Sequence, residues 1–203
     1  MKSIKILSYN IHKGFSIGNR KFILNGIKNA IDEIKPDILF LQEVVGSNSS
    51  KKHIIEGWDN KIQFEFLSKE LCNYYAYGKN AVYTKGDHGN AILSKFPISF
   101  HENINISTNR FEKRGVLHTI IDIPHNESIF KLHALCLHLN LLESGRKVQI
   151  EKVCQRVKNT VKENEAIILA GDFNDWQVNI SDILEEKLEL KDAHFSKFGK
   201  HAR

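Results

Sequence analysis

Two short segments of the chain, 37–41 and 166–170, are apolar at nearly every position. Side chains of a strand point alternately to its two faces, so a strand that is apolar throughout must be covered on both sides. Around these segments, other strand-like apolar runs alternate with stretches that have the periodicity of amphipathic helices. This alternation predicts an α/β protein in which such strands lie at the centre of a covered sheet.

The expected elements follow one another without a linker, repeat or low-complexity segment that would divide the chain. One helix has Ile27 and Ile31 on a single face and ends before Pro36. A polar stretch at 46–53 predicts a surface loop. We therefore predict a single domain over residues 1–203. The other expected elements are strands at 4–11, 37–41, 74–77, 90–94, 98–106, 115–123, 128–139 and from 166, helices around 64–71, 150–161 and 181–187, and turns at Pro97 and 123–126.

Length and composition fit one globular domain with a real core, since the 203 residues are 41% hydrophobic and 26% charged. The formal net charge is +5 and the isoelectric point is about 9.0. Such a balance is compatible with a polyanionic substrate, either nucleic acid or an anionic lipid surface. The lysines are scattered rather than clustered, so a general enrichment in lysine explains the charge better. Charge permits nucleic acid without indicating it.

Cysteine usage and the N-terminal segment predict a cytoplasmic protein. The three cysteines, Cys72, Cys136 and Cys154, lack metal-ligand spacing, and their odd number favours reduced core thiols. A reactive thiol is the weaker alternative. The first residues alternate in polarity and lack the apolar stretch of a signal peptide, which leaves only secretion by another kind of signal open. No run is long enough to cross a membrane.

Four expected strands end in polar residues suited to a metal ion and a phosphate. They are followed by Tyr9-Asn10, Gln42-Glu43, His138-Leu139-Asn140 and Gly171-Asp172-Phe173-Asn174-Asp175. Each of these groups alone would more often be a turn or a structural strand end. Together, an amide, an imidazole and two carboxylates form a hard-oxygen metal site with an acid–base partner. We therefore expect Mg²⁺ or Mn²⁺ as the cofactor.

Other metal and nucleophile chemistries fit the sequence less well. His133 and His138 are an odd number of residues apart in one strand, so they lie on opposite faces and do not share a zinc ion. A calcium-binding EF-hand loop fails because Trp176 stands where a ligand is required. Neither a G-x-S-x-G segment nor a matching cysteine motif supports a serine or cysteine nucleophile.

Basic and amide groups elsewhere in the chain are candidates for binding the phosphate of a substrate. Arg114 opens an expected strand, where a guanidinium could hold a phosphate through two parallel hydrogen bonds. Asn80 and Asn90 lie in a glycine-containing part of the chain that could line a cleft. Arg146 begins a long helix, where we expect it to be solvated on the surface.

Five segments carry a family resemblance: Ser8-Tyr9-Asn10-Ile11, Leu41-Gln42-Glu43-Val44, Gly89-Asn90-Ala91-Ile92-Leu93-Ser94-Lys95-Phe96-Pro97-Ile98, Leu137-His138-Leu139 and Gly171-Asp172-Phe173-Asn174. In this order they resemble the endonuclease/exonuclease/phosphatase superfamily, which shares the fold of pancreatic deoxyribonuclease. Each is weak alone, but five in order are specific and run through nearly the whole chain. The segment 77–83 is also similar to an uncharacterised bacterial branch. The resemblance implies a four-layer sandwich of two mixed β-sheets flanked by helices, with the site at one end.

The resemblance also implies metal-dependent phosphoester cleavage and roles for particular residues. On this basis, Glu43 binds Mg²⁺ and Asn10 helps to hold the metal or the phosphate. Asp172, assisted by Asn174, orients and deprotonates the attacking water. His138 stabilises the phosphorane or protonates the leaving oxygen. Asp175, by contrast, is expected to cap or turn its loop.

The chain departs from the family's pattern near its C-terminal end. The family ends with a strand that carries Ser-Asp-His, whereas this chain ends with Lys-His-Ala-Arg at 200–203. Asp192 and His194 do not replace that pair, because they are not adjacent and directly follow the last expected helix. We therefore expect the closing strands to be missing, either from a fragment or from a shortened member without activity. The chain alone is expected to be poorly stable or weakly active.

The leading functional hypothesis is a Mg²⁺-dependent hydrolase that cleaves a phosphodiester or phosphomonoester by water attack. Nucleic acid, phospholipid and phosphoinositide all stay open as substrates. Neither a basic aromatic insertion nor an exposed apolar hairpin stands out in the sequence to choose between them. The alternative is a non-catalytic binding or interaction module of the same fold, because the last Asp-His pair is absent. The sequence does not indicate the oligomeric state.

Overall fold

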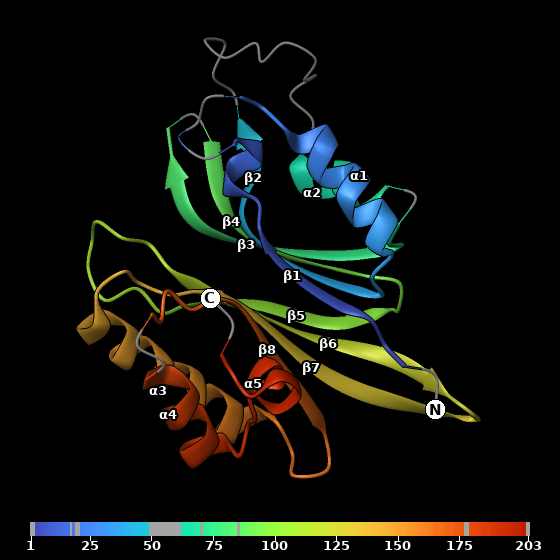
Figure 1. Cartoon of the computed structure of the whole chain (residues 1–203), viewed down its shortest axis with the longest axis vertical. Helices are drawn as coiled ribbons and strands as arrows, with labels where there is room; N and C mark the ends of the chain where they lie inside the picture. Colours follow the sequence, from blue (N-terminus) through green and yellow to red (C-terminus); the bar gives the residue numbers. More distant parts are fainter. Residues whose placement is uncertain are drawn as a thin grey trace.

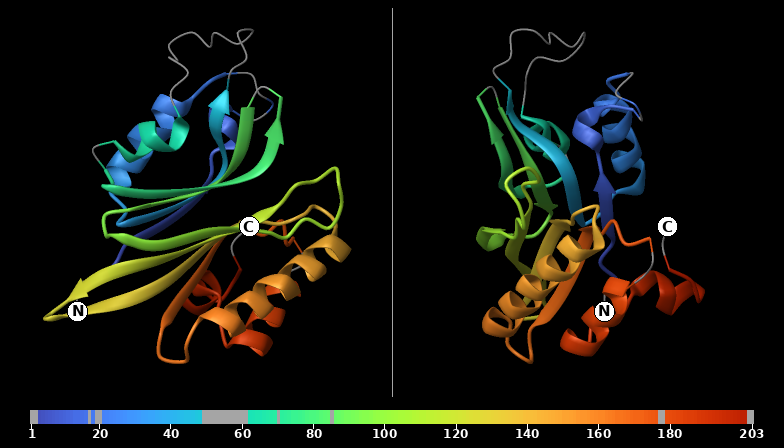
Figure 2. Two further views of the ribbon diagram at one scale, coloured as in Figure 1. Left: turned by 180° about the vertical axis from the view of Figure 1, so that it is seen from behind. Right: turned by 90° about the vertical axis from the view of Figure 1, so that its left-hand side faces the viewer.

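The computed structural model describes residues 3–16, 18, 21–48, 62–69, 71–84, 86–176 and 179–201. In this part of the chain, the strands form two four-stranded sheets that face each other, with helices on the outer sides (Figures 1 and 2). Both sheets contain parallel and antiparallel neighbours. The α/β class and the four-layer sandwich of two mixed sheets predicted from the sequence are therefore confirmed.

The first sheet, in the upper half of Figure 1, has the strand order β1-β2-β4-β3. Its strands are β1 (Ile6–Asn10), β2 (Ile38–Asn48), β3 (Tyr74–Tyr83) and β4 (Gly86–Ser94). β1 and β2 are parallel and are joined by the crossover helix α1 (Leu24–Ile34), whereas the other neighbours are antiparallel. β2 lies inside the sheet, and its first four residues are fully buried, as their apolar sequence predicted.

The second sheet has the strand order β5-β6-β7-β8. Its strands are β5 (Ile98–Asn105), β6 (Gly115–His125), β7 (Ser128–His138) and β8 (Ala166–Asp172). The first three are antiparallel neighbours, and β8 returns parallel to β7 after helix α3 (Glu143–Thr160). Parallel pairing places the ends of β7 and β8 side by side, so that their last residues are register partners.

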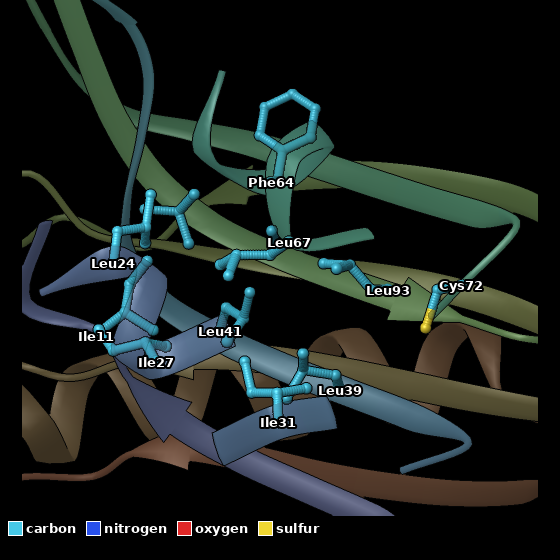
Figure 3. Packing of buried hydrophobic residues seen from close by; sticks show 12 residues of the cluster. Ile11, Leu24, Ile27, Ile31, Leu39, Leu41, Phe64, Leu67, Cys72 and Leu93 are labelled. Carbon is cyan, nitrogen blue, oxygen red and sulfur yellow. The ribbon is translucent and has the colours of Figure 1, made fainter. Parts of the chain in front are cut away.

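Separate apolar clusters hold the layers together. On the first sheet, α1 and α2 (Gln63–Ser68) cover the outer face, where Leu41 packs among Leu24, Ile27 and Leu67 (Figure 3). On the second sheet, α3 and α4 (Asn179–Leu188) bury a similar cluster. A third cluster fills the space between the sheets. No helix among the described residues is long and apolar enough to cross a bilayer.

Helix α5 (Ala193–Phe198) was not expected from the sequence. The Asp192 carboxylate caps it by accepting the backbone N–H groups of His194 and Phe195 at 2.8 and 2.9 Å. The second oxygen of Asp192 lies 2.8 Å from His201 Nδ1. Asp192 thus serves the C-terminal segment itself. Among the described residues, β8 is the last strand.

The polar stretch 46–53, predicted as a surface loop, begins inside β2, which extends to Asn48. Val45 and Asn48 are register partners of His88 and Gly86 in β4. Pairing with β4 thus overrides the polar composition of this part of the stretch. The remaining residues of the stretch lie outside the described part of the chain.

The turn predicted at 123–126 also lies later, because Pro124 belongs to β6. The N–H of Asp122 faces β5 and donates to the Pro97 carbonyl. Pro124 is two positions further on, so its backbone nitrogen faces the same side, where β5 has no residue to pair with it. Proline is tolerated there, since no neighbouring strand needs its missing donor. The chain turns at Asn126 instead, with a φ of 55°.

Candidate active site

Residues from four strands meet at one end of the sandwich. Asn10 ends β1, Glu43 lies in β2, and His138 and Asp172 end β7 and β8. β1 and β8 contact each other across the interface between the sheets. Residues that are far apart in the sequence therefore come together, and we call Asn10, Glu43, His138 and Asp172 the strand-end cluster.

Asn10 links the two carboxylates of this cluster. Its Nδ2 atom donates to Glu43 Oε1 over 3.3 Å and to Asp172 Oδ2 over 3.0 Å. Its Oδ1 atom accepts the backbone N–H of His12 over 3.0 Å, which sets the orientation of the amide. One neutral amide thus holds two negatively charged groups close together.

Glu43 enters the site through an irregularity in β2. The register with β4 shifts between Leu41 and Val44, and Glu43 has a φ of 55°. A bulge of this kind redirects a side chain, and the left-handed conformation is unfavourable for a residue other than glycine. Strain of this type is commonly found at functional sites. The backbone therefore aims Glu43 at the cluster instead of leaving it in the ordinary alternation of the strand.

His12 is a member of the site that the sequence analysis missed. It begins the short helix η1 (His12–Gly14), and its Nδ1 atom lies 3.4 Å from Glu43 Oε2. The signal was its position two residues after Asn10, where the chain leaves β1. His12 adds a second imidazole to the same carboxylate.

His138 is buried between the two carboxylates, with its side chain only 8% exposed. Its Nε2 atom lies 3.6 Å from Asp172 Oδ2, and its Nδ1 atom lies 4.0 Å from Glu43 Oε1. Burial lowers the pKa of His138, and the charge of Arg114 acts in the same direction, against Asp172, Glu43 and Glu112. The imidazole is therefore mainly neutral near neutral pH.

Asp172 is fixed by the loop that follows it. Its Oδ1 atom accepts the backbone N–H of Asn174 over 3.1 Å, and the Asn174 side chain donates to the Leu139 carbonyl over 2.9 Å. Asn174 has a φ of 50°, a conformation that asparagine tolerates better than most residues. Asn174 therefore positions Asp172 and joins its loop to the loop after β7.

Asp175 was expected to cap or turn its loop, and it bonds the start of the helix that follows. Its Oδ2 atom accepts the backbone N–H of Ile180 in the first turn of α4 over 2.7 Å. Its side chain is buried at 7% exposure, and its Oδ1 atom lies 3.9 Å from Arg146 Nη2. Asp175 therefore anchors the start of α4 behind the site.

Two predicted phosphate ligands lie in part-buried positions. Arg114 Nη2 donates to Glu112 Oε1 over 2.6 Å, and the charge of Arg114 reaches His138. Asn80 Oδ1 accepts the Asn103 amide over 3.1 Å. Their phosphate-binding roles stay predictions.

Asn90 occupies a different position from the open cleft that the sequence suggested. It is 1% exposed and lies between the sheets. Its Nδ2 atom donates to the carbonyls of Gly115 and Cys136, in the opposite sheet, over 3.0 and 3.2 Å. Both amide hydrogens are thus used to connect the two sheets, and the side chain acts as a clip at the interface.

Arg146 is buried rather than solvated, so the prediction of a surface residue was wrong. Its side chain is 5% exposed, and Nη1 donates to the Leu141 carbonyl. Nearby, Gln149 makes two hydrogen bonds to Asn140. The Gln149 Oε1 atom accepts the backbone N–H of Asn140 over 2.9 Å, and the Gln149 Nε2 atom donates to Asn140 Oδ1 over 2.8 Å. The first turns of α3 therefore fix the loop that follows His138.

The cysteines are free and buried. Burial raises the pKa of Cys136 to about 12 and that of Cys72 to about 11. Cys136 Sγ lies in the interface between the sheets, 3.3 Å from Gln42 Nε2. Since the thiolate is the reactive form, these positions fit the core thiols predicted from the sequence.

A hard divalent cation fits the donor set of the strand-end cluster. Glu43 and Asp172 bring two carboxylates to one amide donor, with the imidazoles of His12 and His138 beside them. In the described ranges, no three His, Cys, Asp or Glu side chains are arranged so that they could hold a metal ion together. Mg²⁺ needs only one or two carboxylates, because water and substrate oxygens complete its shell. The donors therefore suit Mg²⁺ or Mn²⁺.

Solved structures share the fold at low sequence identity. An endonuclease/exonuclease/phosphatase from Beutenbergia cavernae DSM 12333 has a TM-score of 0.68 and 18% identity over 84% of this chain, which spans about half (47%) of that chain. D. rerio TDP2 complexed with a single-strand DNA product has a TM-score of 0.59 and 19% identity, over 89% of this chain and 64% of that one. A Bacteroides thetaiotaomicron mannosyl-6-phosphatase has a TM-score of 0.57 and 18% identity, over 85% of this chain and 66% of that one.

Sequence similarity extends along nearly the whole chain. Uncharacterized protein YbhP of Escherichia coli strain K12 is 38% identical over 201 residues, which cover 99% of this chain and 78% of that protein. Residues 7–188, which include the whole strand-end cluster, match the model of one protein family. By this match, the chain belongs to the Endonuclease/Exonuclease/phosphatase family.

Proposed function

We propose that this protein is a Mg²⁺-dependent phosphoesterase that hydrolyses a phosphodiester or phosphomonoester by attack of a water molecule. The observation that carries the proposal is the position of Asn10, whose amide donates to both Glu43 and Asp172. His138 lies against the same two carboxylates. A cation-binding group, a general base and a hydrogen-bond donor for the phosphoryl group are thus gathered in one place.

Asp172 is the residue that orients and deprotonates the attacking water. Separate donors hold its two oxygens, namely the Asn174 backbone N–H and the Asn10 amide. Each carboxylate oxygen has a further lone pair, and the side chain is 31% exposed, so water can reach it. The proton passes from the water to a carboxylate oxygen whose position is already set.

His138 is placed to donate a hydrogen bond to the phosphoryl group. The resemblance to the family left open whether it stabilises the phosphorane or protonates the leaving oxygen. Burial lowers its pKa, so the imidazole carries one N–H near neutral pH that it can donate. It therefore stabilises a phosphoryl oxygen whose negative charge increases in the transition state.

Glu43 holds the cation, with Asn10 fixing the direction of its carboxylate. When bound, a divalent cation supplies charge neutralisation at the non-bridging phosphoryl oxygens. Arg114 stands nearby in its pair with Glu112, where its guanidinium can bind a phosphate of the substrate.

Hydrolysis of bis(p-nitrophenyl) phosphate with Mg²⁺ tests the proposal. Asp172→Asn and Glu43→Gln keep the size of the side chains and remove a charge, so each should lower kcat/KM by about 100-fold or more. Asp122→Asn makes the same chemical change in β6, where the carboxylate bonds only Ser99 among the described residues, and should leave the activity unchanged. Full activity of Asp172→Asn would contradict the assignment of the base.

Titration calorimetry with Mg²⁺ separates an enzyme from a binding module. The parent protein should bind Mg²⁺, and Glu43→Gln should lose most of that affinity. If the parent binds Mg²⁺ but hydrolyses neither the diester nor p-nitrophenyl phosphate, the non-catalytic module replaces the proposed enzyme.

A further inference from the structure

Four large apolar side chains are exposed on loops at the end of the sandwich that carries the strand-end cluster. Phe111 is 83% exposed, Leu141 67%, Leu142 72% and Trp176 80%. They lie between β5 and β6, between β7 and α3, and between β8 and α4. Single exposed apolar residues are ordinary, but four on adjoining loops form a surface that a partner can cover. We call these four residues the apolar rim.

Hydrogen bonds join the three loops beside the site. Asn140 Nδ2 donates to Thr108 Oγ1 over 2.8 Å, which connects the β5–β6 loop to the β7–α3 loop. Asn174 Nδ2 donates to the Leu139 carbonyl over 2.9 Å, which connects the β8–α4 loop to the same segment. Figures 1 and 2 show all three loops at one end of the molecule, on the left in Figure 1. The rim residues therefore project from loops that are held together.

The longest of the three loops, between β5 and β6, also carries positive charge. Arg110 lies over the ring of Phe111, with Cζ 4.7 Å from the centroid, and Lys113 is exposed nearby. Glu112, the acidic residue of this loop, is paired with Arg114. The loop therefore keeps an excess of positive charge, which attracts an anionic surface.

We propose that the apolar rim docks this protein on an anionic lipid bilayer. Leu141 and Leu142 have no ring that could stack on a nucleobase, which disfavours single-stranded nucleic acid as the occupant. Leucine side chains suit the apolar layer, Trp176 suits its boundary, and Arg110 and Lys113 suit the anionic head groups.

The rim also explains why no exposed apolar hairpin stood out in the sequence. Its members are divided among three loops, and none of these loops is a continuous apolar segment. Docking itself depends on the rim and on the positive charge of the loop that carries Phe111, and not on the strand-end cluster. The docking proposal also names a substrate class, and in this respect it rests on the proposed function. The substrate is then the phosphoester of a phospholipid head group, which the bilayer presents to the strand-end cluster beside the rim.

Sedimentation with vesicles of phosphatidylcholine, with and without phosphatidylglycerol, measures the docking. The parent protein should bind the mixed vesicles and bind pure phosphatidylcholine less well. Trp176→Ser and the double variant Leu141→Ser/Leu142→Ser should each lower the partition coefficient by about tenfold. Ile129→Ser is the matched control, because Ile129 is 68% exposed at the opposite end of β7 and should have no effect.

Several results would overturn the docking proposal. The first is that the protein does not sediment with mixed vesicles, and the second is that Ile129→Ser loses as much vesicle binding as the rim variants. The third is that the protein binds a DNA oligonucleotide instead of vesicles and that Trp176→Ser abolishes this DNA binding. The rim variants should keep the circular dichroism spectrum and the hydrolysis of soluble bis(p-nitrophenyl) phosphate. Vesicle binding without hydrolysis of any ester would refute the proposed function and leave docking intact. Hydrolysis of the soluble ester without hydrolysis of vesicle phospholipid would refute the substrate class.

Discussion

Replacement of Gly171 by alanine should weaken both the fold and the site. Gly171 has a φ of 151°, a conformation that costs other residues about 1–3 kcal/mol. An added Cβ would lie 1.9 Å from the carbonyl oxygen of Leu137 in the neighbouring strand, whereas ordinary contact begins at 3.4 Å. β7 and β8 would have to separate there by about 1.5 Å, and overpacking of this kind costs about 1–3 kcal/mol more. We expect the free energy of unfolding to fall by about 2–6 kcal/mol.

The same separation would move Asp172, which directly follows Gly171, relative to Asn10 and His138. A displacement of about 1 Å can lower a catalytic rate about 100-fold, so the kcat/KM of the folded variant should fall by a similar factor. Urea denaturation measures the stability, and hydrolysis of bis(p-nitrophenyl) phosphate measures the rate.

Gly26→Ala provides the matched control for this experiment. Gly26 lies in α1, and an added Cβ meets no atom within 4 Å. The substitution should raise the free energy of unfolding by about 0.5–1 kcal/mol and leave the activity unchanged. If Gly171→Ala were as stable and as active as the parent, the close approach of β7 and β8 at this residue would be refuted.

Two further predictions concern buried polar groups. Burial lowers the pKa of His118 from 6.5 to about 4. Between these two pH values the unfolded chain binds more protons than the folded chain, so acidification favours unfolding. The free energy of unfolding should therefore fall from pH 6.5 to pH 4, by about 3 kcal/mol at pH 4. Urea denaturation across this range should show a smaller loss for His118→Gln, and parallel profiles would contradict the assignment. Asn90→Ala removes the two hydrogen bonds to Gly115 and Cys136 and should lower the free energy of unfolding by about 2 kcal/mol. Urea denaturation should show this as a lower midpoint. An unchanged midpoint would show that these two hydrogen bonds contribute nothing to stability.

The residues of the strand-end cluster could be predicted because they stand at or near the ends of apolar strands. Strand ends gather at the edge of layered α/β folds, so their chemistry is visible as a local pattern. Their spacing is a different matter, since Asn10 and Asp172 are 162 positions apart and meet only through the packing of two sheets. The left-handed backbone of Glu43 was also beyond prediction, because it depends on the shift of register between β2 and β4.

The wrong predictions share a physical cause in long-range partners. Helical periodicity describes how α3 faces the sheet. It does not show that the guanidinium of Arg146 turns inward to donate a hydrogen bond to the carbonyl of Leu141 in the preceding loop. Likewise, Asn90 looked like a cleft residue because of its glycine neighbour, although the carbonyls that bind it belong to the other sheet. Polar residues with such partners cannot be distinguished from solvated ones by local sequence.

The strand-end cluster belongs to neither sheet alone. Asn10 and Glu43 come from the first sheet, and His138 and Asp172 come from the second. A fluctuation that parts the sheets would therefore dismantle the site while each sheet kept its own hydrogen bonds and helices. In mild denaturant, turnover should vanish before far-ultraviolet dichroism changes, so that enzymatic activity becomes a gauge of how firmly the two halves are joined.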